Sequence, residues 1–113
     1  MLINFDAIEE TIIPNMRGGE KQYNVRMFND GACKIMKGRL IPGASIGLHA
    51  HEADSETMYF LEGTGKVLYQ GEYLPVAPGS CHYCPKGESH SLINDSGEDL
   101  IFFAVIPVHK EAN

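Results

Sequence analysis

The stretch that decides the fold is residues 43–63, GASIGLHAHEADSETMYFLEG, together with residues 79–94, GSCHYCPKGESHSLIN. The first segment holds two histidines separated by one residue, and the second holds one more histidine near its end. Side chains two residues apart on a β-strand point to the same face and lie about 6.6 Å apart. His49 and His51 can therefore converge on one ion if this segment is a strand, whereas on a helix they would diverge.

Glu56 and His90 complete a set of four candidate metal ligands. Glu56 follows His51 by an odd number of residues, which is the wrong parity for one face of an unbroken strand. The polar link at residues 52–55 is therefore expected to turn or bulge the chain, so that Glu56 faces His51 from the neighbouring strand. Three imidazoles and one carboxylate suit one divalent transition metal per chain, namely Fe, Mn, Ni, Co, Cu or Zn, and the ligand set does not choose among them.

Glycines and a proline extend this pattern into two longer motifs. Both resemble the two sequence motifs of the cupin superfamily, and together they span residues 43–94 of the 113-residue chain. The matching positions are Gly43, His49, His51, Glu56 and Gly63 in the first motif and Gly79, Pro85, Gly87, His90 and Asn94 in the second. The resemblance implies one cupin domain over residues 1–113, folded as an antiparallel β-barrel of the jelly-roll or double-stranded β-helix type. It also implies that His49, His51, Glu56 and His90 face the interior and meet at one metal ion.

The rest of the chain shows the rhythm of an antiparallel all-β protein. Short apolar or alternating runs are separated by glycine-bearing turns at intervals of about 6 to 12 residues. Residues 67–74 read as a hairpin with Gln70 and Gly71 at the turn, and residues 100–108 read as a strand buried on both faces. Residues 3–13 fit either a short helix or an edge strand, and the pattern does not decide between them.

Composition narrows the classes of partner. The formal charge of −6 and the pI near 5.2, with no basic cluster, argue against nucleic acid. The N-terminal residues lack a signal-peptide pattern and no apolar run is long enough for a membrane span, so a soluble, cytoplasmic protein is expected. Three cysteines suggest reduced thiols. Cys81 and Cys84 could be a redox or zinc pair, but strand residues three apart point to opposite faces, which disfavours both readings.

The ligand set also predicts the character of the site. Three neutral imidazoles and one carboxylate around a divalent ion leave a formal charge of +1, and octahedral coordination leaves two positions for an anionic, bidentate ligand. Met58, Phe60 and Leu92 are expected to form apolar walls. Proton transfer would need a further polar group, and the candidates, each more simply explained as a solvent-facing strand residue, are Lys37, Arg39, Tyr69, His82 and Tyr83.

The sequence thus predicts a metal-dependent enzyme acting on a small polar metabolite such as a sugar, sugar acid or keto-acid. A redox metal would support dioxygenase chemistry, and a redox-inert metal would support isomerase or lyase chemistry. The alternative is a non-catalytic cupin that binds or senses a small ligand, because the fold alone does not give an activity. The resemblance to other small cupins also implies a homodimer.

Overall fold

The computed structural model describes residues 1–110 as an almost entirely antiparallel β-structure. No helix in this range is long and apolar enough to cross a membrane. The described chain contains two short 3-10 helices and ten strands, which are, in order, η1 (Phe5–Ala7), β1 (Thr11–Pro14), η2 (Met16–Gly18), β2 (Gln22–Asn29), β3 (Cys33–Leu40), β4 (Ser45–Ala50), β5 (Glu56–Glu62), β6 (Gly65–Tyr69), β7 (Glu72–Val76), β8 (Cys81–Cys84), β9 (Ser89–Ile93) and β10 (Leu100–Pro107).

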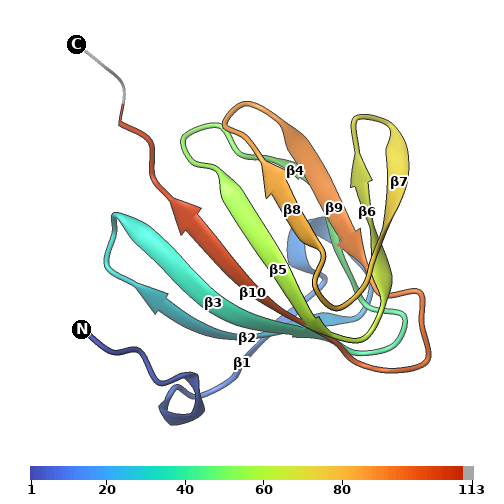
Figure 1. Ribbon diagram of the computed structural model, residues 1–113, viewed down its shortest axis with the longest axis horizontal. Coiled ribbons are helices and arrows are strands. Elements are labelled where there is room, and N and C mark those ends of the chain that lie inside the picture. Colours follow the sequence, from blue (N-terminus) through green and yellow to red (C-terminus); the bar gives the residue numbers. More distant parts are fainter. Residues whose placement is uncertain (111–113) are drawn as a thin grey trace.

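The strands form two antiparallel sheets that pack face to face (Figure 1). The six-stranded sheet has the order β1-β2-β3-β10-β5-β8, and the four-stranded sheet has the order β4-β9-β6-β7. The predicted all-β antiparallel fold class is therefore confirmed. It takes the form of a jelly-roll sandwich, since no strand pairing within residues 1–110 joins one sheet to the other.

The core lies between the sheets and is centred on β10. Leu100, Phe102 and Ala104 alternate along this strand and are fully buried. The Phe102 ring stacks on Tyr23 at a centroid distance of 5.9 Å and lies 5.8 Å from Phe60, so three strands of the larger sheet share one aromatic cluster. The outward face of β10 is only half-buried, which differs from the expectation that both faces would be fully buried.

Two local predictions can be compared with the backbone. The β6–β7 hairpin turns at Gln70 and Gly71, which have φ values of 52° and 76°. Positive φ at both central residues is the type I′ geometry that matches the twist of paired strands, so the predicted hairpin is confirmed. The undecided segment at residues 3–13 contains both expected forms, since η1 is followed by the edge strand β1.

The segment that connects β1 to β2 has an unusual backbone. Asn15, Arg17 and Lys21 all have left-handed φ values, of 50°, 55° and 56°. A residue with a Cβ pays about 1 kcal/mol or more for this conformation, so long-range contacts must hold it in place. The contacts are with β4, against which η2 packs. This connection therefore lies beside the strand that carries the first candidate ligand.

Candidate metal centre

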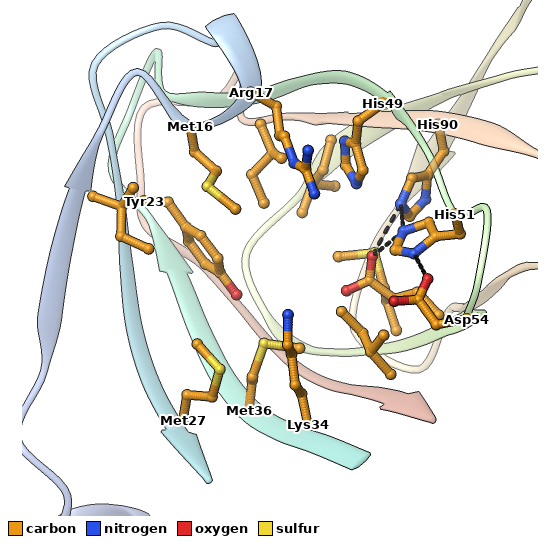
Figure 2. Close-up of a pocket in the computed structure, with 16 residues that line it drawn as sticks. Met16, Arg17, Tyr23, Met27, Lys34, Met36, His49, His51, Asp54 and His90 are labelled. Atoms are coloured by element: carbon orange, nitrogen blue, oxygen red, sulfur yellow. Dashed lines mark hydrogen bonds and ion pairs between the residues drawn. The ribbon is translucent and has the colours of Figure 1, made fainter. Parts of the chain in front are cut away.

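The four candidate ligands converge at the inner surface of the smaller sheet. The ligand atoms of His49, His51, Glu56 and His90 all lie within 4.8 Å of one another. His51, Glu56 and His90 are buried, and His49 is partly exposed. Figure 2 shows the imidazoles of His49, His51 and His90 side by side. The structure thus brings together every residue that the sequence singled out as a metal ligand.

Strand register explains how two of the histidines meet. His49 on β4 lies directly opposite His90 on β9 in the antiparallel ladder. The ladder shifts register between Ile46 and His49, which marks a β-bulge at residues 47–48. Without the bulge, Ile46 and His49 would point to opposite faces because they are three residues apart. The bulge lets both side chains line the interior.

Glu56 reaches the cluster from a different place than expected. It is the first residue of β5, which belongs to the six-stranded sheet, whereas His51 follows β4 in the four-stranded sheet. Glu56 does face His51, at 3.2 Å, and the polar link at residues 52–55 does turn the chain. The strand that Glu56 begins is not hydrogen-bonded to β4, however, because this link crosses from one sheet to the other. The carboxylate thus faces the imidazoles from across the sandwich.

Hydrogen bonds orient each imidazole so that Nε2 faces the centre of the cluster. The Nδ1 atoms lie 2.7 Å from the Gly47 carbonyl oxygen for His49 and 2.6 Å from Asp54 Oδ1 for His51. For His90, Nδ1 lies 3.0 Å from His82 Nε2. A histidine that binds a metal through one ring nitrogen usually donates the other N–H to such a partner. All three histidines therefore have the tautomer-fixing contact that a metal ligand needs.

The distances within the cluster fit a metal of the expected size. His51 Nε2 lies 3.0 Å from His90 Nε2, and Glu56 Oε1 lies 3.2 Å and 2.9 Å from these two atoms. Ligand atoms at about 2.1 Å from an ion, in adjacent octahedral positions, are separated by about 3.0 Å. The donor set and its spacing therefore fit a divalent transition metal, and the cluster could hold one.

Glu56 is held as a carboxylate, and the pKa values of His49 and His51 shift in opposite directions. Burial raises the pKa of Glu56, but hydrogen bonds from His51 and His90 outweigh burial and lower this pKa to about 2. Burial also lowers the pKa of His49. For His51, burial lowers the pKa, but the hydrogen bonds to Glu56 and Asp54 outweigh it and raise the pKa. A proton therefore competes with a metal more strongly at His51 than at His49.

An open cavity of about 90 Å³ lies against the cluster. Met58 and Leu92 line it, as predicted, whereas Phe60 is fully buried in the core and does not. The cavity also has two cationic residues, Arg17 and Lys34, that the sequence did not single out. The full lining is Ile13, Met16, Arg17, Tyr23, Met27, Lys34, Met36, Ile46, His49, His51, Asp54, Glu56, Met58, His90, Leu92 and Ile106.

The five candidates for proton transfer lie outside this lining. Arg39 forms ion pairs with Glu10 at 2.7 Å and with Asp99 at 3.2 Å, and Tyr83 is exposed. His82 is buried and contacts His90, so the expectation that it faces solvent was wrong. Alternation along β8 places His82 inside, and the sequence alone gave no sign of which face of this strand is inward.

Comparison with known proteins places this geometry in a family. The family model described as "Cupin domain" matches residues 36–106, which is more than half of the chain. The chain belongs to the cupin family. This cupin is 35% identical over 112 residues to an oxalate-binding protein of Thermotoga maritima, covering 94% of this chain and 93% of that protein. It is also 34% identical over 64 residues to a glucose-6-phosphate isomerase of Thermococcus gammatolerans, of which the match covers 34%.

Solved structures agree with the fold of this cupin. A crystal structure of a protein described as a predicted oxalate decarboxylase of Thermotoga maritima superposes with a TM-score of 0.89 at 33% identity, covering 96% of this chain and 99% of that one. A sugar phosphate isomerase from the cupin superfamily, from Silicibacter pomeroyi, superposes with a TM-score of 0.79 at 23% identity, covering 95% and 75% of the two chains. The second likeness supports the fold alone.

Proposed function

We propose that this cupin binds a small carboxylate ligand at a metal held by His49, His51, Glu56 and His90, with oxalate as the first candidate. The observation that carries the proposal is the cluster itself, which has three oriented imidazoles and one carboxylate beside an open cavity. A divalent ion with these ligands has a net charge of +1 and two free octahedral positions, which suit two oxygen atoms of one anion. The name of the Thermotoga maritima relative supports oxalate as the ligand to test first.

The cavity walls suit such a ligand in size and polarity. A volume of about 90 Å³ accommodates a molecule of a few heavy atoms, and Met58 and Leu92 keep part of its surface apolar. A sugar, sugar acid or keto-acid remains within the class of small polar metabolites that the sequence predicts. Among these, a carboxylate has the charge that the centre can neutralise.

Binding with turnover is the second candidate, and the Tyr23 hydroxyl is the observation that favours it. Decarboxylation of oxalate replaces one carboxylate with hydrogen, so that oxalate and one proton give formate and carbon dioxide. Tyr23 lines the cavity, and burial, with the nearby Glu56 carboxylate, raises its pKa, so the hydroxyl keeps its proton. This hydroxyl is therefore one group of the lining that carries a proton, as the Lys34 ammonium also does.

Titration calorimetry with oxalate tests whether the protein binds this ligand. An assay for formate then distinguishes binding alone from binding with decarboxylation. We expect binding to metal-loaded protein and a large loss of affinity in metal-free protein and in the His49→Ala variant. Formate production that is lost in Tyr23→Phe would favour the enzyme, and binding without consumption of oxalate would favour a non-catalytic binding or sensor cupin. Absence of any binding by the loaded protein would contradict the proposed ligand.

The extent of the domain and the assembly are part of the proposal. Strands β1 and β2 lie outside the matched residues 36–106, but β1 pairs with β2 and β2 pairs with β3 in the same sheet, so we place the whole chain, 1–113, in one cupin domain. Tyr59, Leu61 and Tyr83 are exposed on the outer face of that sheet, at 45%, 40% and 54%. Such a face suits a homodimer, which light scattering would detect as twice the chain mass. Three unpaired thiols suit a cytoplasmic location.

A further inference from the structure

We propose that Arg17 and Lys34 form a second anion-binding subsite in the cavity, so that the ligand of this cupin is a dianion. The inference rests on the proposed function, because one end of the ligand would occupy the metal centre and the other would contact the two cations. Figure 2 shows both side chains pointing into the cavity, with Arg17 beside His49 and Lys34 entering from the opposite wall. Neither residue belongs to the ligand cluster.

The position of Arg17 is fixed by close backbone packing. A Cβ atom added at Gly47 would lie 2.1 Å from the Arg17 carbonyl oxygen, and one added at Gly19 would lie 2.0 Å from the Ser45 carbonyl oxygen. Only glycine at both positions allows the η2 segment to approach β4 this closely. The Glu20 amide also donates a 2.8 Å hydrogen bond to Ser45 Oγ, which ties the segment to the same strand.

This packing connects the cation to a metal ligand. Gly47 packs against the backbone of Arg17. The carbonyl oxygen of the same glycine lies 2.7 Å from Nδ1 of His49. The left-handed φ of 55° at Arg17 persists although it is unfavourable for a residue with a Cβ. The η2 segment is thus held where its guanidinium enters the cavity next to His49.

Both cationic groups are available to a ligand. Within residues 1–110, the Arg17 guanidinium and the Lys34 ammonium have no hydrogen bond or ion pair with the protein. Other arginines in the same range do have such partners, as Arg39 does with Glu10. A planar guanidinium matches a carboxylate in a two-point contact, and an ammonium adds a mobile point charge.

The charge of the lining indicates the charge of the ligand. A divalent ion is offset by the Glu56 and Asp54 carboxylates, which leaves the positive charges of Arg17 and Lys34 without a counterpart in the lining. A dianion neutralises both charges, whereas a neutral sugar neutralises neither. A small dicarboxylate therefore fits this cavity better than a monocarboxylate of the same size.

The test compares oxalate with glycolate, which has the same two-carbon skeleton but only one carboxylate. Calorimetry would use metal-loaded wild type, the Arg17→Gln/Lys34→Gln double variant and Lys66→Gln as a matched control. Lys66 lies on β6, pairs with Asp95 at 3.7 Å and does not line the cavity. We expect the double variant to lose about 10-fold or more in oxalate affinity and clearly less in glycolate affinity. Its metal affinity, measured by chelator competition, should equal that of wild type.

Unchanged oxalate affinity in the double variant, or equal losses for the two ligands, would overturn the second subsite. A separate titration of metal-free protein with inorganic phosphate distinguishes this failure from failure of the proposed function. If loaded wild type binds neither carboxylate, the proposed function fails, while phosphate binding that depends on Arg17 and Lys34 would still support the subsite. Equal phosphate binding by metal-free wild type and double variant would overturn it.

Discussion

The Nε2 atom of His82 lies 3.0 Å from Nδ1 of His90, while Nε2 of the same His90 ring lies 2.9 Å from the Glu56 carboxylate. A metal bound at Nε2 requires the proton of His90 to reside on Nδ1, so His82 accepts that hydrogen bond. Burial lowers the pKa of His82 to about 4, which keeps it a neutral acceptor near pH 7. His82 thus orients the ring of His90, one of the four proposed ligands, from the side opposite the cluster.

Removal of this partner should weaken metal binding without removing a ligand. We expect His82→Leu to lower metal affinity by about 10-fold to 100-fold, because His90 would lose the contact that fixes its tautomer and orientation. Competition with a chromophoric chelator measures the change. Tyr83→Leu, at the exposed neighbouring position on β8, is the control and should bind metal as wild type does. Equal affinities for His82→Leu and wild type would contradict this role.

Two glycines of the cupin motifs should differ in their tolerance of alanine. Gly63 and Gly79 both have positive φ, at 80° and 94°, but a Cβ at Gly63 would lie 2.2 Å from the Asp99 carbonyl oxygen, whereas Gly79 faces open space. We expect Gly79→Ala to cost about 1–2 kcal/mol of unfolding free energy for the backbone conformation alone. Gly63→Ala should cost about 1–3 kcal/mol more, because the backbone must move. Urea denaturation gives both values, and equal losses would count against the steric argument.

The left-handed backbone at Arg17 predicts that two variants with the same loss of binding differ in stability. Glycine adopts a φ of 55° freely, whereas alanine does not. After allowance for the greater freedom of glycine in the unfolded chain, Arg17→Gly should be more stable than Arg17→Ala by a few tenths to about 1 kcal/mol. Both variants should bind oxalate equally weakly, because both lack the guanidinium. If Arg17→Ala unfolds at the same urea concentration as Arg17→Gly, the left-handed conformation is not maintained.

The ion pair on the outer face of the larger sheet predicts a pH dependence of stability. Glu10 accepts hydrogen bonds from Arg39 at 2.7 Å and from Asn24 at 3.0 Å, which together hold its pKa below the usual value. Its contribution to stability is therefore fully present above the unfolded-state pKa of about 4.3 and is lost as pH falls through the lower folded-state pKa. Partial exposure limits this contribution to about 1 kcal/mol.

The Glu10→Gln variant measures that contribution. We expect it to unfold at lower urea concentration than wild type at pH 7, and the difference should narrow as the pH is lowered below about 4. A difference that stays constant down to pH 2.5 would show that Glu10 acts through shape or packing and not through its charge.

The sequence was sufficient to predict the ligand cluster because its spacing reflects local geometry. His49 and His51 share a face through the two-residue period of a strand, and His90 was placed beside them by the motif resemblance. Asn94, the last position of the second motif, is fully buried and donates to the carbonyl oxygens of Leu40 and Glu98. The β-bulge beside His49 and the sheet to which Glu56 belongs were not predictable, because both depend on pairing between distant strands.

The sequence also did not predict that Arg17 and Lys34 line the cavity. Arg17 carries no motif, and its position depends on a left-handed backbone and on close packing of Gly19 and Gly47. Lys34 and Lys37 both lie on β3, and only the fold shows that Lys34 lines the cavity and Lys37 does not. Asp54 follows His51 by three residues and contacts its Nδ1 atom at 2.6 Å, but a carboxylate at that spacing in a turn is too common in sequences to predict the contact.

The most direct test of the central claim is the metal content of untagged protein purified without chelators, measured by elemental mass spectrometry beside the His49→Ala variant. The account predicts about one divalent transition metal ion per chain in wild type and a large loss in a variant that circular dichroism shows to be folded. Wild type that holds no such metal, even after incubation with Mn, Fe, Co, Ni, Cu and Zn and removal of the excess, would contradict it.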